Sequence, residues 1–325
     1  MPEFQAAQTH SILLITLSNI GDAVLTTPVL QALQASYPQA VIDIVTDARA
    51  AELFTHCPAR GAIILKHKQL GWRGTFALVR QLRARSYDLV VDLRTDGLTL
   101  LLRARQRLTR RHSKPAGRHA VERHFGVIRE WLQLETIPPV HVWLSNAEHA
   151  FAQQQLAGLP GQHWLALGPG ARWQGKCWPV DRYTRLATGL QPHFDALILL
   201  GSQADRERCA QIEAGVDFPC VNLAGRTNLL QATAVLQLAR LFVGNDSGLG
   251  HLAAAADTPT VTVFGPGDPR RYHPWHPLAR WVQSATGAIA DVSVATVSAL
   301  ALQQPSSRTG AERPDHLQTS KQQTP

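Results

Sequence analysis

The sequence is poor in cysteine and in long apolar runs, and each shortage excludes a class of protein. Its four cysteines are far apart and never form a C-x-x-C pair, so they predict neither a zinc site nor a disulfide framework, and a reducing cytoplasm suits them. No run reaches the roughly 18 consecutive apolar residues that a membrane-spanning helix needs. The first ten residues, MPEFQAAQTH, have neither a basic leader nor an apolar core, so we expect no signal peptide.

Acidic residues are scarce relative to basic ones. The 24 Asp and Glu stand against 32 Lys and Arg, which gives a formal charge of +8 at pH 7. Much of the excess lies in segment 103–123, where Glu122 is the single acid. This surplus favours an anionic partner, either nucleic acid, an acidic membrane surface or a phosphorylated sugar, although a solvated loop is the alternative. Aromatic residues do not interleave with the arginines, which disfavours single-stranded nucleic acid.

Short apolar runs rich in β-branched residues alternate with helix-period segments twice along the 325 residues. The first series spans about residues 12–93, and the second runs from about Pro160 to Leu302 with five expected strands. Such alternation is typical of parallel sheets covered by helices. We therefore predict an α/β fold with two Rossmann-like domains facing across a cleft, over residues 1–158 and 159–302. Residues 303–325 are too polar to bury a core and are expected to be disordered.

A Gly-Asp pair follows the first expected strand, in the stretch NIGDAVLTTPVLQAL. In open parallel sheets, ligands bind outside the carboxyl ends of the strands, so this position suits a functional residue. Pro28 restricts the early helix, which is expected to begin either at Asp22 or at Thr27. Taken alone, Asp22 is either a helix cap, which stabilises by about 1 kcal/mol, or a catalytic carboxylate.

The stretch WLALGPGARWQGKCWP, residues 164–179, lies at a second strand end. Gly168 and Gly170 let the backbone come close to a ligand, and Lys176 can place a point charge on a phosphate. The segment is not a Walker loop, and it lacks the third glycine of a dinucleotide fingerprint. Taken by itself, it fits a structural loop better than a ligand site.

A third turn occurs in LFVGNDSGLGHLAAAADTPTVTVFGP, residues 241–266. Asp246, Ser247 and Gly248 stand between an expected strand and an alanine-rich helix, and His251 lies on its first turn. Small residues leave the first helix amides accessible, and those amides with the helix dipole favour an anion such as a diphosphate. The alternative is a glycine-rich helix cap in which Asp246 or Ser247 satisfies the amides and His251 packs locally.

Together the three turns, with HAVERHFGVI at residues 119–128, resemble glycosyltransferase family 9, the lipopolysaccharide heptosyltransferases, over about residues 11–300. The resemblance implies the GT-B architecture, with the nucleotide-sugar donor on the C-terminal half and the acceptor on the N-terminal half. It also implies transfer of heptose from ADP-L-glycero-β-D-manno-heptose to the lipopolysaccharide inner core, with inversion. One position departs from the pattern, because Gln203 stands where some members carry a donor-contacting acid, although Asp205 could substitute.

The resemblance also supplies residue roles. Asp22 matches the proposed general base, which takes the proton of a sugar hydroxyl as the new bond forms. No D-x-D motif occurs, so neither a metal nor a cofactor beyond the donor is expected. The predicted donor-binding residues are Gly168, Gly170, Lys176, Asp246, Ser247, Gly248 and His251.

Arg118, His119 and Arg123 are the predicted acceptor contacts, because an inner-core acceptor carries carboxylates and phosphates that arginine can pair. The same charge suits peripheral attachment at the cytoplasmic face of the bacterial inner membrane. The expected partners are a nucleotide sugar, an anionic lipid-linked oligosaccharide and that membrane surface, and not nucleic acid. Two alternatives stay open: a transferase of the same fold that uses another nucleotide sugar for a different surface glycan, and a non-catalytic protein that binds nucleic acid or lipid A.

Overall fold

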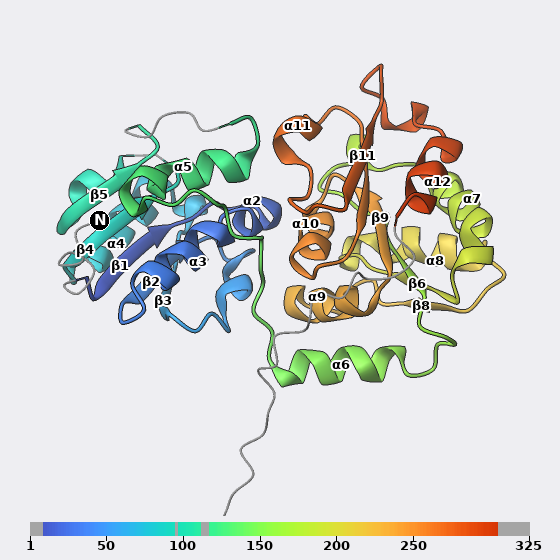
Figure 1. Ribbon diagram of the computed structural model, residues 1–325, viewed down its shortest axis with the longest axis horizontal. Coiled ribbons are helices and arrows are strands. Elements are labelled where there is room, and N and C mark those ends of the chain that lie inside the picture. The colour runs from blue at the N-terminus through green and yellow to red at the C-terminus, as the bar shows by residue number, and fades with distance from the viewer. Residues whose placement is uncertain (1–8, 95–96, 112–116, 305–325) are drawn as a thin grey trace, which may run out of the picture.

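The computed structural model describes residues 9–94, 97–111 and 117–304. Within these ranges the chain forms two parallel β-sheets, each covered by helices, and Figure 1 shows the two units beside each other. The predicted α/β architecture of two Rossmann-like units is confirmed. Most of the predicted tail, residues 305–325, lies outside the described ranges, as do residues 112–116 of the basic segment.

The first unit is built on five parallel strands: β1 (Ser11–Ile15), β2 (Val41–Thr46), β3 (Arg60–Leu65), β4 (Tyr87–Asp92) and β5 (Ala104–Thr109). Their order in the sheet is β3-β2-β1-β4-β5, so β1 lies at the centre. In register, Ile12 of β1 stands opposite Ile42 of β2 and Leu89 of β4. Because all strands point the same way, their carboxyl ends share one edge of the sheet.

Helices cover both faces of this sheet. They are α2 (Ile20–Val24), α3 (Thr27–Ser36), α4 (Gly71–Arg83), the 3₁₀ turn η3 (Leu98–Leu101) and α5 (Ala120–Leu132). Successive side chains of β1 point to opposite faces. Ile12 and Leu14 therefore pack with α3 and α5, whereas Leu13 and Ile15 pack with α4 and η3. The two faces belong to separate hydrophobic cores.

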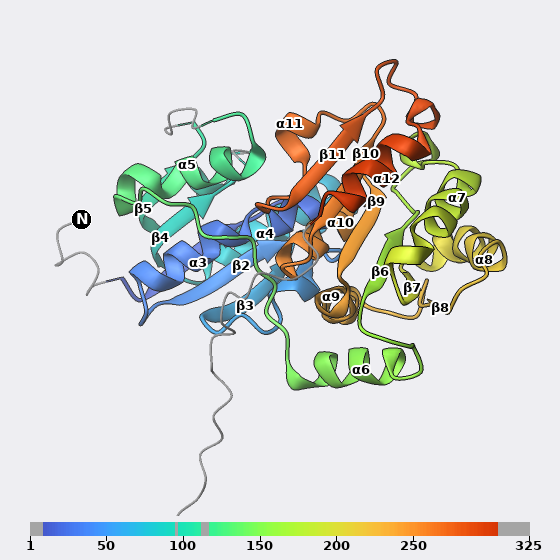
Figure 2. The same ribbon diagram turned by 45° about the vertical axis from the view of Figure 1, so that its right-hand side comes forward.

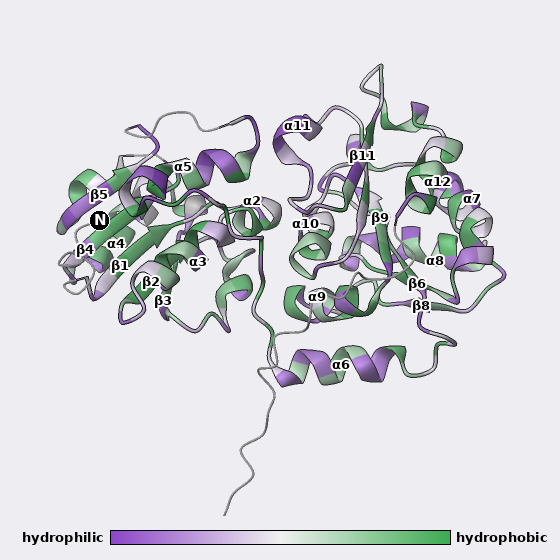
Figure 3. Cartoon of the chain, viewed as in Figure 1, coloured by the Kyte–Doolittle hydropathy of each residue, from purple (hydrophilic) through white to green (hydrophobic). Residues whose placement is uncertain are grey.

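The second unit contains six parallel strands: β6 (Trp164–Gly168), β7 (Ala196–Leu199), β8 (Cys220–Asn222), β9 (Leu241–Asn245), β10 (Thr260–Phe264) and β11 (Ala279–Gln283). Their order is β11-β10-β9-β6-β7-β8, which makes β9 and β6 inner neighbours. Figure 3 shows that the inner strands are apolar, as buried parallel strands require. The five predicted strands are confirmed, and β11 is an additional one.

The helices of the second unit are α7 (Val180–Leu190), α8 (Arg206–Ala214), α9 (Leu229–Leu238), α10 (Gly248–Ala255), α11 (Pro269–Tyr272) and α12 (Val294–Leu302). Leu165 and Leu167 of β6 pack with α7, α8 and α12. Ala166 of the same strand faces α9 and α10, in a cluster that also contains Ile12 and Leu14 of β1. One hydrophobic core therefore continues from the first sheet into the second.

Helix α6 (Asn146–Leu156) lies between the two units in sequence, and it packs against α9 of the second unit (Figure 2). Its N-cap Ser145 accepts a hydrogen bond from Ala147 N, and Glu148 completes the capping box by accepting from Ser145 N. The predicted domain boundary at residue 158 stays a prediction. No helix among the described residues is long and apolar enough to cross a membrane.

The chain after β1 forms two short helices rather than one. Helix α2 begins at Ile20 and ends at Val24, and α3 begins at Thr27 with Pro28 in its first turn, where proline is tolerated. Between them, Thr26 Oγ1 lies 2.8 Å from Thr16 Oγ1 and donates to Ala23 O at 2.7 Å. This buried hydroxyl contact fixes the break, so α2 is a separate element at the carboxyl end of β1.

Candidate functional site

Helices α2 and α10 pack against each other where the two units meet. A Cβ atom at Gly21 would lie 2.5 Å from His251 Cδ2, and one at Gly248 would lie 3.0 Å from Ile20 Cγ2. Both glycines therefore permit an approach that larger residues would obstruct. Each helix starts beyond the carboxyl end of an inner strand, β1 or β9. The predicted site residues of the two units are thus brought face to face.

Asp22 lies on the first turn of α2 and is half-buried. Its carboxylate does not cap the helix: Asp22 Oδ2 accepts a hydrogen bond from Asn19 Nδ2 at 2.8 Å, and α2 has no side-chain cap. Asn19 Oδ1 in turn accepts from Arg172 Nη1 of the second unit at 3.3 Å. Asp22 is therefore oriented by a side-chain amide that also contacts the loop after β6.

The N-terminus of α10 faces this loop. Ser247 is its N-cap in extended backbone conformation, but the side chain makes no capping bond. Ser247 Oγ is buried and has no hydrogen-bond partner within the described parts of the chain. The leading amides of α10 and one hydroxyl are thus oriented as donors without a protein side chain to cap them, the arrangement that binds phosphate oxygens. Ser247 occupies the N-cap position, but the alternative in which its side chain satisfies the helix amides is wrong.

Lys176 ends the 3₁₀ turn η4 (Gln174–Lys176) in the loop after β6, and Asp246 follows β9. Lys176 Nζ lies 2.5 Å from Asp246 Oδ2, with 28% and 13% of the two side chains exposed. Because β6 and β9 are adjacent, their following loops lie side by side and the pair closes across them. Asp246 therefore balances the ammonium group rather than capping α10.

Asn245, which the sequence analysis did not predict as a site residue, connects these loops by hydrogen bonds. It is completely buried at the end of β9. Its Oδ1 accepts from Trp178 N at 3.0 Å and from Tyr183 OH at 2.9 Å, while Nδ2 donates to Pro169 O at 2.8 Å. A buried amide with its donors and acceptor satisfied holds the surrounding backbone in one arrangement. The one available signal was a polar residue ending the apolar run LFVGN.

Gly168 and Gly170 have neighbours that explain the absence of a side chain. A Cβ at Gly168 would lie 2.7 Å from Phe242 Cζ, and one at Gly170 would lie 2.3 Å from Asp205 Cγ. The absence of a Cβ at the two glycines therefore leaves space for neighbouring protein side chains, and the contact of these glycines with a donor stays a prediction. Asp205 Oδ2 accepts from Ser202 N and Oγ at 2.8 and 2.7 Å, so this carboxylate is already engaged in a capping box.

His251 is almost completely buried beside Gly21. Burial lowers the pKa of its imidazole to about 4, with further contributions from His273 and Lys176. The ring is therefore neutral at pH 7, and its Nδ1 has no hydrogen-bond partner among the residues described. Like Gly248, His251 is a predicted donor-binding residue that packs α10 against α2, and its contact with a donor stays a prediction.

His119 differs from its prediction as an acceptor contact. It is 3% exposed and caps α5 through Nδ1, which accepts from Val121 N at 3.2 Å. The other nitrogen, Nε2, therefore carries the proton and donates to His273 O of the second unit at 2.9 Å. Burial lowers the pKa of His119 to about 4, and the ring stacks against Trp275 with centroids 4.7 Å apart. Nδ1 thus caps α5 and Nε2 joins the two units, which leaves neither nitrogen for a sugar.

Arg118 and Arg123, the other two predicted acceptor contacts, line a cavity of about 760 Å³ between the units. Arg270 and Arg271, on α11 of the second unit, line its opposite side. Within the described ranges none of these four side chains forms an ion pair with an acid, and Arg271 Nε is buried without a hydrogen-bond partner. The pKa of nearby Arg110 is lowered by burial and then by Arg123 and Arg271. Asp268, whose Oδ1 accepts from Arg270 N at 3.1 Å, is the one carboxylate among the lining residues, so the cavity carries an excess of positive charge.

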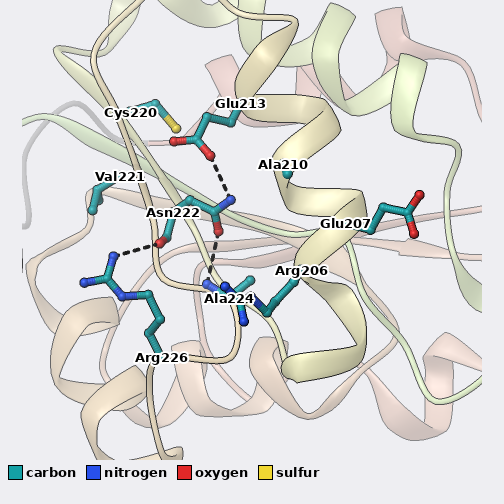
Figure 4. A pocket seen from close by; sticks show the side chains of 9 residues that line it. All are labelled: Arg206, Glu207, Ala210, Glu213, Cys220, Val221, Asn222, Ala224 and Arg226. Atoms are coloured by element: carbon teal, nitrogen blue, oxygen red, sulfur yellow. Dashed lines mark hydrogen bonds between the residues drawn. The ribbon is translucent and has the colours of Figure 1, made fainter.

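A second cavity, of about 610 Å³, lies on the far edge of the second sheet beside α8 and β8 (Figure 4). Two of its hydrogen bonds are made by Asn222: Nδ2 donates to Glu213 Oε2 at 2.9 Å, and Oδ1 accepts from the backbone Ala224 N at 3.1 Å. None of the predicted site residues lines it. The functional site is therefore assigned to the junction of α2 and α10.

No group of three His, Cys, Asp or Glu side chains in the described ranges is placed to hold a metal ion. The prediction of a metal-independent reaction stays a prediction. The candidate site consists of a carboxylate on α2 of one unit and, at or beside the contacting helix α10 of the other, a lysine, a helix N-terminus and a buried hydroxyl.

Comparison with known proteins places this arrangement in a family context. The model of glycosyltransferase family 9 (heptosyltransferase) matches residues 102–299. Lipopolysaccharide heptosyltransferase 3 of Escherichia coli K12 is 30% identical over 285 residues, covering 78% of this chain and 82% of the relative. Lipopolysaccharide heptosyltransferase 2 of the same strain is 29% identical over 308 residues, covering 85% and 88%.

The solved structure of E. coli ADP-heptose lps heptosyltransferase II has a similar fold. It superimposes with a TM-score of 0.73 and 27% sequence identity, covering 90% of this chain and 99% of that structure. Because the superposition covers 90% of this chain, the likeness includes both sheets.

Proposed function

The chain belongs to glycosyltransferase family 9, and from that membership we propose that it transfers heptose from ADP-L-glycero-β-D-manno-heptose to the lipopolysaccharide inner core, with inversion. The GT-B architecture and the heptosyltransferase class follow from the relatives, so the alternative of a non-catalytic anion-binding protein is not retained. The name of the solved relative, an ADP-heptose heptosyltransferase, supports ADP-heptose as donor. Asp22 is the proposed base.

One observation carries the proposal: α2 and α10 are in contact, and a Cβ added at Gly248 of α10 would lie 3.0 Å from Ile20 Cγ2 of α2. Asp22 is two residues from Ile20, and Gly248 contributes the first helical amide of α10. The carboxylate and the anion-binding amides therefore belong to elements in direct contact. A sugar whose diphosphate binds at the α10 amides would therefore lie on the element that contacts α2, the helix that carries the proposed base.

In the proposed reaction, the acceptor hydroxyl attacks the anomeric carbon of the donor and gives its proton to Asp22. The bond to the diphosphate breaks, and its electron pair leaves with the nucleoside diphosphate. Lys176, Ser247 Oγ and the α10 amides stabilise the negative charge that develops there. Because attack occurs opposite the leaving group in a single displacement, the anomeric configuration inverts.

The arginine cavity is the proposed acceptor subsite. Arg118 and Arg123 approach it from the first unit, whereas Arg270 and Arg271 approach it from the second. A carboxylate or phosphate of the inner core would give these guanidinium groups a counter-charge, and arginine pairs such groups in bidentate fashion. His119, which joins the units through His273, is reassigned from acceptor contact to positioning residue.

A different nucleotide sugar is the second candidate for the donor, because of the residue at position 203. Gln203 replaces an acid expected in some family members, and Asp205 is held by Ser202 rather than turned to a ligand. Thermal shifts with ADP, UDP, GDP and CDP distinguish the donors. Stabilisation by ADP above the others supports ADP-heptose, whereas a preference for UDP or GDP would overturn it.

The proposal is tested by assaying transfer from purified ADP-heptose to a set of truncated lipopolysaccharide cores. Nuclear magnetic resonance of the product reports whether the anomeric configuration has inverted. A retained configuration would exclude single displacement. R270Q/R271Q should raise the acceptor KM about tenfold or more and leave the donor KM unchanged.

A further inference from the structure

Large apolar side chains project into solvent from the start of α4. Leu70 in the 3₁₀ turn η2 (Lys68–Leu70) is 55% exposed, Trp72 is 75% exposed and Phe76 is 66% exposed. Trp72 and Phe76 are four residues apart and so share one face of the helix. The opposite face, with Leu78 and Leu82, is buried against the sheet. Helix α4 is thus apolar on two sides.

The turn η3 adds two further side chains to this surface. Leu100 is 75% exposed and Leu101 is 53% exposed. Turn η3 contacts α4, and both elements cover the same face of the first sheet. We call these five residues the apolar patch: Leu70, Trp72, Phe76, Leu100 and Leu101. Several large exposed apolar side chains on two contacting elements mark an interaction surface, whereas single exposed apolar residues do not.

The surroundings of the apolar patch carry positive charge. From Arg60 to Ser86 the sequence contains no Asp or Glu. Arg80 and Arg83 continue the exposed face of α4 that begins with Trp72 and Phe76, and Arg73 Cζ lies 5.6 Å from the Trp72 ring centroid. Arg103, just beyond η3, is also exposed. Aromatic and leucine side chains bordered by arginines are typical of elements that lie in an anionic membrane interface.

The position of the apolar patch relates it to the site. Turn η2 and the start of α4 follow the carboxyl end of β3, and η3 follows that of β4. Asp22 follows the carboxyl end of β1 in the same parallel sheet. The patch and the proposed base therefore lie toward one edge of the first unit.

We propose that the apolar patch inserts into the headgroup region of an anionic membrane and that the neighbouring arginines pair with lipid phosphates. This rests on the proposed function and extends it, since the proposed acceptor is lipid-linked. It moves the membrane contact from segment 103–123 as a whole to α4 and η3, with Arg103 at their border. A second copy of the chain fits less well. A two-fold contact would bring the arginines of both copies together with no acid on either α4 or η3.

Vesicle flotation tests the inference without requiring catalysis. The full chain should bind vesicles of phosphatidylcholine with about one-third phosphatidylglycerol, and bind pure phosphatidylcholine much less. W72Q/F76Q should lower binding to the anionic vesicles about tenfold or more, because both rings lose their apolar contact. R80Q/R83Q should lower it less and reduce its dependence on salt. L302Q, which removes an exposed leucine from α12, is the matched control and should bind normally.

Unchanged vesicle binding by W72Q/F76Q would overturn the inference. Two other results would also overturn it. One is self-association that depends on Trp72 and Phe76 in a chain that does not bind vesicles, and the other is binding only to an acidic protein. A parallel assay separates this result from the proposed function. W72Q/F76Q should lose transfer to vesicle-embedded acceptor but retain transfer to a deacylated acceptor. Absence of transfer to either acceptor by the unmodified enzyme would contradict the function, not the membrane contact.

Discussion

The ammonium of Lys176 and the carboxylate of Asp246 form an ion pair 2.5 Å long between loops that are 70 positions apart in the sequence. Two residues predicted to meet the donor are therefore bound to each other. The pair places the lysine at the N-terminus of α10 with its charge partly balanced. A diphosphate then has to share the ammonium with Asp246, so donor binding and this contact are coupled.

Replacing Lys176 by methionine should lower kcat by about 100-fold or more, since a charge that stabilises the leaving group is lost. Steady-state kinetics with varied donor measure the effect. K66M, at a lysine just beyond β3 in the first unit, is the control and should retain activity. Unimpaired turnover by K176M would remove the ammonium from the mechanism.

Replacing Asp22 by asparagine should lower kcat by roughly 100- to 10,000-fold while ADP binding stays within twofold of the unmodified enzyme. The amide keeps the size of the carboxylate but cannot take a proton. Calorimetry with ADP and transfer kinetics report the two quantities. D47N alters an Asp at the carboxyl end of β2, where it pairs with Arg49, and should be silent. Full activity in D22N would require another base.

Replacing Gly21 by alanine should destabilise the chain by about 1–3 kcal/mol, because the new methyl group would overlap His251. Denaturant unfolding gives the change in free energy. G158A, where an added Cβ has open space, should be nearly neutral. In a double-mutant cycle, H251A should relieve part of the cost of G21A, and strict additivity would show that the two residues do not contact each other.

Acid should destabilise the fold through His124. Burial lowers its pKa to about 3, with Arg110, His119, Arg123 and Arg271 contributing, and its Nδ1 has no partner among the described residues. Between pH 6.5 and about 3 the unfolded chain binds a proton that the folded chain does not, so stability falls as pH decreases. From pH 7.5 to pH 5 this amounts to about 2 kcal/mol.

H124F should remove that increment, which unfolding curves at the two pH values measure. H149Q, at an exposed histidine of α6, serves as the comparison. An H124F chain that loses as much stability at pH 5 as the unmodified chain would show that His124 does not cause the acid sensitivity.

Local patterns in the sequence predicted the inner strands because each is a short apolar run that ends in a polar or small residue. Strand β5 escaped prediction: its sequence ARQRLT places arginines on an edge strand, where exposure permits them. Strand β11, ARWVQ, is also an edge strand with a half-exposed pattern.

The contacts that form the site could not be predicted in the same way. Gly21 and His251 lie 230 positions apart, and no local preference of either residue specifies the other. The same holds for Asn19 with Arg172 and for the arginines that meet across the cavity. His119 lies in a recognisable motif, HAVERHFGVI. The motif did not reveal that His119 Nε2 would donate a hydrogen bond to His273 O, and for this reason the role of His119 changed.

Four guanidinium groups line one cavity, whereas its single lining carboxylate, Asp268, accepts a hydrogen bond from the Arg270 backbone amide. This imbalance of charge has a practical consequence for anyone who handles this enzyme. Inorganic phosphate and sulfate carry the charge that the arginines attract. Buffers that contain these salts should raise the melting temperature and, at the same time, compete with the acceptor. The conditions that best preserve the purified enzyme would then be those in which its activity is most underestimated.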